Sequence, residues 1–159
     1  MKNKVYIETS IPSFYHNNRT ELEMMARRNW TREWWDNSRK YYNIVTSQAV
    51  LDELRGGNFP TQEHTINLLK DVPLVPIEPP ISEIVQVYIQ HRIMPNDPLG
   101  DALHLALASF HKCDFLLTWN CKHIANANKF THIKRINVML DLFTPMLVTP
   151  LELIWEDNK

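Results

Sequence analysis

The chain has few glycines, few cysteines and no long apolar run, and each shortage narrows the class of protein. Glycine accounts for 3 of the 159 residues and proline for 10, so proline supplies most of the breaks between elements. The two cysteines, Cys113 and Cys121, form neither a disulfide framework nor a C-x-x-C motif. No apolar run approaches the roughly 20 residues of a membrane span, and no signal peptide is visible. We expect a cytoplasmic protein with reduced thiols and no membrane contact.

An excess of either charge is also lacking. The formal net charge is -1, from 17 Lys and Arg against 18 Asp and Glu. Proteins that hold nucleic acid through bulk charge are basic, so contact with nucleic acid would need a local patch or a metal ion. Hydrophobic residues make up 44% and charged residues 22%, which is typical of a globular domain. The length predicts a single domain over residues 1–159.

Strand and helix patterns alternate along the chain. Strands are expected at 5–7, 44–46 and 115–118, with others in "PLVPIEPP" and "LVTPLELI". Helices are expected at 20–42, 47–55, 61–70, 82–92, 98–111 and 129–142. Such alternation predicts an α/β fold of three layers, in which helices flank a parallel sheet of four to five strands. Ligands of such sheets bind outside the carboxyl ends of the strands.

Polar side chains occur where these strands end. Glu8 directly follows the strand at 5–7, and Asn120 directly follows "FLLTW". Glu53 borders the buried stripe of its helix, and Asp101 lies in the first turns of an almost wholly apolar helix, where an acid is costly unless it is paired or binds a metal. Carboxylate and amide oxygens are the ligands that Mg²⁺ and Mn²⁺ prefer. His104 follows Asp101 by three residues, but no H-E-x-x-H or Cys/His cluster indicates zinc.

Each acid also has a purely structural interpretation. Asp97, directly before Pro98, is typical of a helix N-cap followed by proline at the first helical position. Asp101 would suit the dipole at the N-terminus of the same helix. Glu53 would pair with Arg55 or another segment, and Glu8 would cap the helix that follows it. Their shared position at strand ends favours one common site.

Four stretches of the chain resemble the PIN domain, and more narrowly the VapC-like toxin nucleases of toxin–antitoxin pairs. They are "VYIETSIPSFY", "TSQAVLDELRGG", "DALHLALASFHKCDFLLTWNCKHIAN" and "VTPLEL". Because they are spread from Val5 to Leu153, the resemblance extends over nearly the whole chain. The resemblance implies an RNase H-like fold and a metal-dependent endoribonuclease that uses Mg²⁺ or Mn²⁺. It also implies a homodimer and an antitoxin partner.

The family pattern assigns roles to particular residues. It implies Glu8, Glu53, Asp101 and Asn120 as catalytic residues, the first three of them as metal ligands. Aspartate is usual at the positions of Glu8 and Asn120, and the missing charge at Asn120 favours one tightly held ion over two. The residues expected to orient the substrate are Thr9, Ser10 and Thr118, and those with an expected secondary role are Asp97, Lys122 and His123. The alternative is a PIN fold with a degraded, inactive metal site that binds RNA or a protein.

The expected helix at 20–42 carries both aromatic and basic residues. One apolar stripe at helical spacing, predicted to face the core, consists of Leu22, Ala26, Trp30, Trp34 and Tyr41. Met24, Met25 and Trp35 fall off this stripe, as residues of a protein–protein surface would. The basic residues of the helix are Arg27, Arg28, Arg32, Arg39 and Lys40. They form a solvated face, an RNA-guiding patch or a seat for an acidic antitoxin segment, and the sequence leaves all three interpretations open.

Overall fold

The computed structural model describes residues 1–157, and a four-stranded sheet lies at its centre. The strands are β1 (Lys4–Ile7), β2 (Asn43–Val45), β3 (Phe115–Leu117) and β4 (Met146–Val148). They pair in the order β2-β1-β3-β4, and every pair is parallel. The expected α/β class and a parallel sheet at the low end of the expected strand number are therefore confirmed.

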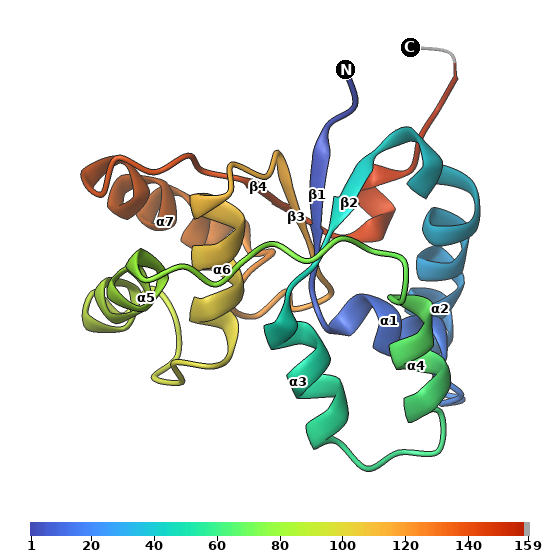
Figure 1. Cartoon of the computed structure of the whole chain (residues 1–159). Helices are drawn as coiled ribbons and strands as arrows, with labels where there is room; N and C mark the ends of the chain where they lie inside the picture. Colours follow the sequence, from blue (N-terminus) through green and yellow to red (C-terminus); the bar gives the residue numbers. More distant parts are fainter. Residues whose placement is uncertain (158–159) are drawn as a thin grey trace.

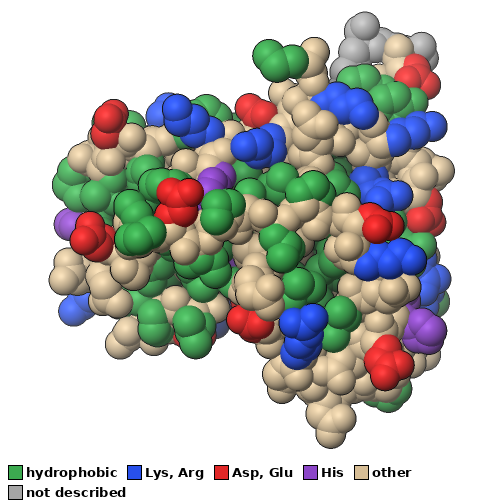
Figure 2. Space-filling view, in the orientation of Figure 1, with side chains coloured by type: hydrophobic (Ala, Val, Ile, Leu, Met, Phe, Trp, Pro, Cys, Tyr) green, Lys and Arg blue, Asp and Glu red, His purple; other side chains and the backbone are tan. Residues whose placement is uncertain are grey.

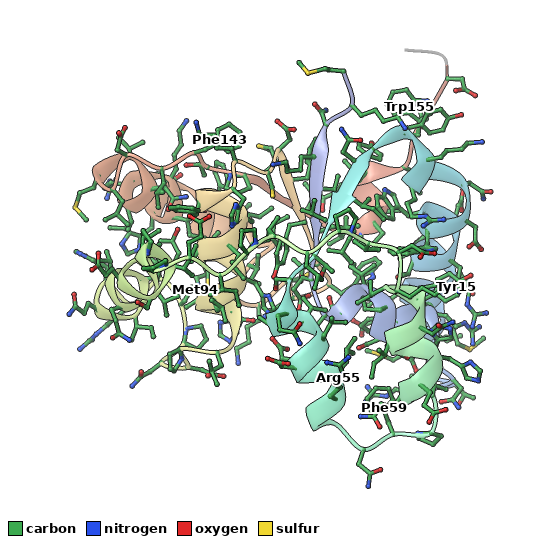
Figure 3. All side chains as sticks on the ribbon, viewed as in Figure 1. Tyr15, Arg55, Phe59, Met94, Phe143 and Trp155 are labelled. Carbon is green, nitrogen blue, oxygen red and sulfur yellow. The ribbon has the colours of Figure 1, made fainter. Side chains whose placement is uncertain are left out.

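Helices flank the sheet on two sides (Figure 1). One group consists of α1 (Ser10–Tyr15), α2 (Leu22–Glu33), α3 (Gln48–Gly56) and α4 (Gln62–Leu68). The other consists of α5 (Pro80–Gln90), α6 (Asp101–Phe110) and α7 (Ala127–Met139). A short 3-10 helix, η3 (Pro150–Leu153), follows β4. Figure 3 shows Met94 between α5 and α6, where its side chain is buried.

Surface charge is mixed in sign, as the composition predicts. Figure 2 shows Lys, Arg, Asp and Glu side chains interspersed over one face, with hydrophobic side chains between them. None of the helices described between residues 1 and 157 is long and apolar enough to cross a membrane.

The helix expected at 20–42 is present, but it is not regular. After α2 the chain continues as a π-helix, η1 (Trp34–Ser38), and then as a 3-10 helix, η2 (Arg39–Tyr41). A π-turn holds more residues than an α-turn, so it shifts the face that each later side chain presents. Trp34 and Trp35 are consequently both buried, and the prediction that Trp35 lies off the core was wrong. Leu22, predicted to face the core, is 86% exposed.

The helix expected to begin at Pro98 begins at Asp101, and Gly100 is its N-cap. Asp97 therefore does not cap α6. Its carboxylate Oδ1 accepts a hydrogen bond of 3.1 Å from the backbone N–H of Leu99, which closes a turn before the helix. Asp101 is the first residue of α6, so it lies in the first turn of the helix, as expected.

Two further features follow from the many prolines and few glycines. The segment "PLVPIEPP" forms only an isolated parallel bridge between Leu74 and Thr46, because proline cannot donate to a ladder. Positive φ angles occur at Arg92, Lys112 and Asp141, each just beyond the end of a helix, where glycine is the usual residue.

Candidate active site

Glu8 is positioned by the pairing of β1 with β3. The register sets Ile7 opposite Leu117, and the N–H of Glu8 extends the ladder with a 3.2 Å hydrogen bond to the Leu117 carbonyl. Thr118 therefore lies beside Glu8 at the carboxyl edge of the sheet. Since side chains alternate along a strand, Glu8 shares a face with Tyr6.

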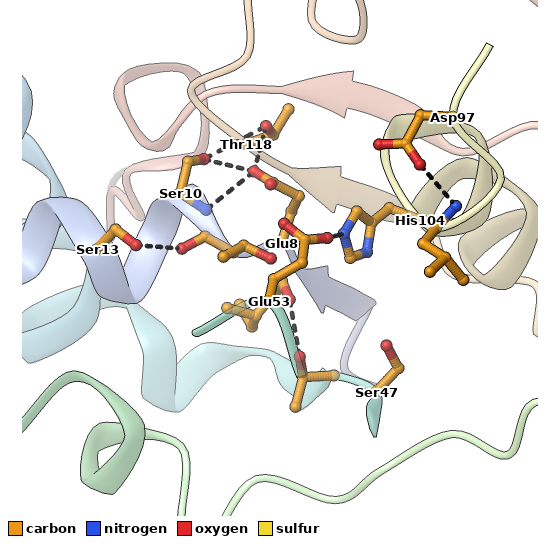
Figure 4. A network of polar contacts seen from close by, with 12 residues as sticks. Glu8, Ser10, Ser13, Ser47, Glu53, Asp97, His104 and Thr118 are labelled. Atoms are coloured by element: carbon orange, nitrogen blue, oxygen red, sulfur yellow. Dashed lines mark hydrogen bonds and ion pairs between the residues drawn. The ribbon is translucent and has the colours of Figure 1, made fainter. Parts of the chain in front are cut away.

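One oxygen of the Glu8 carboxylate accepts three hydrogen bonds (Figure 4). Oε1 accepts from the Ser10 N–H at 3.1 Å, the Ser10 hydroxyl at 2.5 Å and the Thr118 hydroxyl at 2.6 Å. The residue is 6% exposed, and Oε2 accepts no hydrogen bond from residues 1–157. The carboxylate is thus held in one orientation with its second oxygen available to a ligand. The bond from the Ser10 N–H also caps the start of α1, as the structural interpretation of Glu8 predicted.

Helix α6 contributes two residues to the same region. Asp101 and His104 are three residues apart, so they lie on one helix face. The His104 ring is 1% exposed and has a polar partner at each nitrogen. Nδ1 lies 2.8 Å from the Tyr6 hydroxyl, and Nε2 contacts Oε1 of Glu53 from α3 (Figure 4). His104 therefore links the middle strand of the sheet to the acid on α3.

Charge at the site favours a protonated His104. Burial lowers its pKa, but the hydrogen bond with Glu53 and the charges of Glu8, Glu53 and Asp101 outweigh burial and raise it above the usual value. A protonated imidazole donates to both Tyr6 and Glu53. Burial also raises the pKa of Tyr6, so that its hydroxyl keeps its proton and donates to the Ser47 hydroxyl at 2.7 Å. This explains why Ser47, expected as the cap of α3, makes no capping hydrogen bond there.

Three side chains at this edge could share a metal ion. Potential ligand atoms of Glu8, Glu53 and His104 all lie within 4.8 Å of one another. While Glu53 holds Nε2 of His104, the remaining donors are carboxylate oxygens, which suit Mg²⁺ and Mn²⁺. Release of that contact would add an imidazole nitrogen, a ligand better suited to zinc or iron.

Asp101 lies at the margin of this group. It is half-buried and is not among the three residues whose ligand atoms converge. In the part of the chain that the structure describes, its carboxylate makes no hydrogen bond or ion pair. Its negative charge nevertheless helps to raise the pKa of His104 and opposes the lowering of the Lys129 pKa by burial.

Asn120 serves the turn after β3. Its side-chain Oδ1 accepts a 3.0 Å hydrogen bond from the N–H of His123, and its carbonyl accepts from Ile124 and Ala125. Its own N–H donates to the Thr118 hydroxyl at 2.9 Å. The amide oxygen predicted to take the place of a fourth acid is therefore engaged by the backbone. Lys122 beside it is exposed, and His123 is half-buried.

The residues that were expected to orient the substrate form their hydrogen bonds mainly with other residues of the protein. The hydroxyls of Ser10 and Thr118 both donate to Glu8. The Thr9 hydroxyl is buried and has no hydrogen-bond partner in residues 1–157. Asp97 is occupied by its turn, as described above.

His104 is the residue that the sequence-based prediction missed, together with its partners Tyr6 and Ser47. The signal was present, because the spacing from Asp101 puts both side chains on one helix face. His104 was not predicted as a site residue because it belongs to no zinc-binding motif. Its partner Glu53 is 51 positions away, so only the tertiary structure shows the pair.

Fold and site together define an α/β protein with an acidic cluster at the carboxyl edge of a parallel sheet, where such proteins bind ligands. No protein-family model, curated protein or solved structure matches the chain. The chemistry of the site is therefore inferred from its own residues.

Proposed function

We propose that this protein is a divalent-metal-dependent endoribonuclease with a PIN-like, RNase H-like fold. The observation that carries the proposal is the convergence of Glu8, Glu53 and His104 at the carboxyl edge of the sheet, with ligand atoms within 4.8 Å of one another. The resemblance of "DALHLALA" and "DFLLTWN" to the PIN family supplies the substrate class, RNA. It also suggests a toxin that acts in the cytoplasm, with a homodimer and an antitoxin partner.

The donor set fits a hard divalent cation. Glu8 offers a fixed carboxylate with a free Oε2, and Glu53 and Asp101 bring two further negative charges. Glu8 and Glu53 would hold Mg²⁺ or Mn²⁺, and Asp101, at the margin of the group, would add its negative charge nearby. When bound, such an ion lowers the pKa of an attacking water and offsets the negative charge of the phosphate.

The chain's own residues prepare this chemistry. Ser10 and Thr118 fix the Glu8 carboxylate, and His104 holds Glu53 and offsets carboxylate charge. The side chain of Glu53 is 37% exposed, so a water can reach it and give up a proton to it. The family resemblance assigns Thr9 to the water or phosphate, and its hydroxyl has no hydrogen-bond partner within residues 1–157.

A second function has one observation in its favour. Asn120 replaces the usual fourth acid, and its oxygen is bonded to the N–H of His123. A site that lacks that charge would bind RNA or a protein without cutting it. The two functions differ in one measurable property, cleavage that depends on metal.

The test is cleavage of a mixed RNA pool by the purified protein in Mg²⁺, in Mn²⁺ and in EDTA. Asp101→Asn, purified in parallel, controls for contaminating nucleases. Because Asp101 forms no hydrogen bond within residues 1–157, its replacement should cost only its electrostatic interactions with the helix dipole and with His104, about 1 kcal/mol. We expect cutting that requires metal and falls at least about 100-fold in the variant, since even residues that only support metal ligands are worth about 10–100-fold.

Two results would count against the nuclease. Equal cutting by Asp101→Asn and the wild type would indicate a contaminant or a different site. No cutting in any metal, by folded protein free of bound partner, would favour the binding module. Asn120→Asp would then be the first variant to test for recovered cleavage.

A further inference from the structure

A pocket of about 520 Å³ lies between the loop that follows α5 and the start of α7. Two of its lining residues are cationic, Arg92 just beyond α5 and Lys129 in the first turn of α7, and His123 in the turn after β3 adds an imidazole ring to the lining. Met94 and Pro95 belong to its uncharged lining, and no acidic side chain is among the described residues that line it. The pocket is therefore positively charged in a chain whose net charge is -1.

These cationic groups have no anionic partner in direct contact. Among residues 1–157, neither a salt bridge nor a hydrogen bond involves a side-chain nitrogen of Arg92, His123 or Lys129. Burial lowers the pKa of Lys129, and the charge of Asp101 acts in the opposite direction without an ion pair forming. Charges gathered in a pocket without partners repel one another, and an anionic ligand would remove that repulsion.

Hydrogen bonds connect this pocket to the acidic site. The Thr118 hydroxyl donates to Glu8 and accepts from the N–H of Asn120, whose side-chain oxygen accepts the N–H of His123. The charge of Asp101 acts on both His104 and Lys129. The hydrogen bonds from Glu8 through Thr118 and Asn120 to His123 therefore link the cationic pocket to the carboxylate cluster.

We propose that this pocket binds a backbone phosphate of the RNA strand, next to the phosphodiester at the carboxylates. This inference rests on the proposed ribonuclease function and adds a substrate subsite to it. The Arg92 guanidinium can meet two phosphate oxygens at once, and Lys129 and His123 supply further donors. Half-buried Pro95 offers apolar surface to a ribose. In this arrangement the Asn120 side chain positions the backbone of His123 instead of binding metal.

The test measures RNA binding without cleavage. A short fluorescent single-stranded oligoribonucleotide is titrated in EDTA with wild type, with Arg92→Gln/Lys129→Gln, and with Lys134→Gln/Arg135→Gln. The last variant removes the same two charge types from exposed positions of α7, so it controls for net charge. We expect about a tenfold decrease in affinity in the pocket variant and less than about a twofold decrease in the control. The slope of log affinity against log salt should also fall by about 0.7 for each phosphate that the pocket variant no longer neutralises.

Competition identifies the ligand. Inorganic phosphate should displace the RNA only weakly, because it occupies one of the several positions that a strand fills. Equal affinities of the two double variants would overturn the subsite, as would tighter binding of free phosphate or of a glutamate-rich peptide than of RNA. The same experiments separate this subsite from the proposed ribonuclease function. If the protein shows no metal-dependent cleavage but the pocket variant still binds RNA more weakly, the nuclease is refuted and the subsite stands. If the wild type cleaves RNA but the pocket variant binds RNA as tightly as the control variant, the nuclease stands and the subsite is refuted.

Discussion

Thr118→Val should show how far Glu8 depends on its hydrogen bonds. Valine keeps the shape of threonine at a fully buried position but removes the hydroxyl that donates to Glu8 and accepts from the Asn120 N–H. A hydrogen bond to a charged group is worth about 1.5–3 kcal/mol. The Asn120 N–H would lose its partner in a half-buried position, where water replaces part of the bond. We expect the free energy of unfolding to fall by about 2–4 kcal/mol in total.

Activity should fall as well, since Glu8 would keep only its two bonds from Ser10. Residues that orient metal ligands are typically worth about 10–100-fold in metal affinity or activity. The assay combines urea denaturation with cleavage rates measured over a range of Mn²⁺ concentrations. The reduction in rate should shrink as Mn²⁺ rises, because a loosely held carboxylate binds metal more weakly.

Thr118→Ser is the matched control. It keeps the hydroxyl and removes one buried methyl group, so stability should fall by about 0.5–1.5 kcal/mol and cleavage should remain close to wild type. The reasoning would be refuted if Thr118→Val retained full stability and full activity, or if Thr118→Ser lost as much activity as Thr118→Val.

Three further predictions concern other parts of the fold. Lys112→Gly should raise the free energy of unfolding in urea by about 0.5–1 kcal/mol, because Lys112 has a φ of 54° that glycine adopts without strain; a decrease would contradict this. Burial raises the pKa of Tyr88 from 10.0 to about 12, so Tyr88 contributes about 2.7 kcal/mol to the free energy of unfolding below pH 10, and this contribution is lost as the pH rises to 12. Over that interval the free energy of unfolding of Tyr88→Phe should fall less steeply with pH than that of the wild type. A thiol reagent should label exposed Cys121 in the folded protein and leave Cys113 unmodified until denaturant is added, because Cys113 is buried and burial raises its pKa to about 12; early labelling of Cys113, seen by mass spectrometry, would count against the packing.

Local pattern was enough to predict the strands. The predictions for β1 and β3 lie within one residue of the observed bounds, because short runs such as Val5-Tyr6-Ile7 have strong strand propensity and turn residues at both ends. Glu8 and Glu53 could be named for the same reason, since each has a recognisable place relative to a strand end or a helix stripe.

The sequence-based predictions were wrong or incomplete where contacts of particular side chains, and not the local residue pattern, determine the structure. At the start of α6, the Asp97 carboxylate closes a turn with the Leu99 N–H, and Gly100 is non-helical with φ -102° and ψ -132°. The burial of Trp35 depends on a π-turn, which simple helical spacing does not include. The role of His104 depends on contacts with β1 and α3, and the register of distant segments is not readable from one helix.

The hydrogen bond between Glu8 and Thr118 spans 110 positions of the chain. It forms only when β3 has paired with β1, so a growing polypeptide on a ribosome cannot complete the hydrogen bonds of Glu8 until Thr118 has been made. Under the proposed function, the site would stay incomplete up to that point, while the polypeptide lies next to the messenger RNA that encodes it.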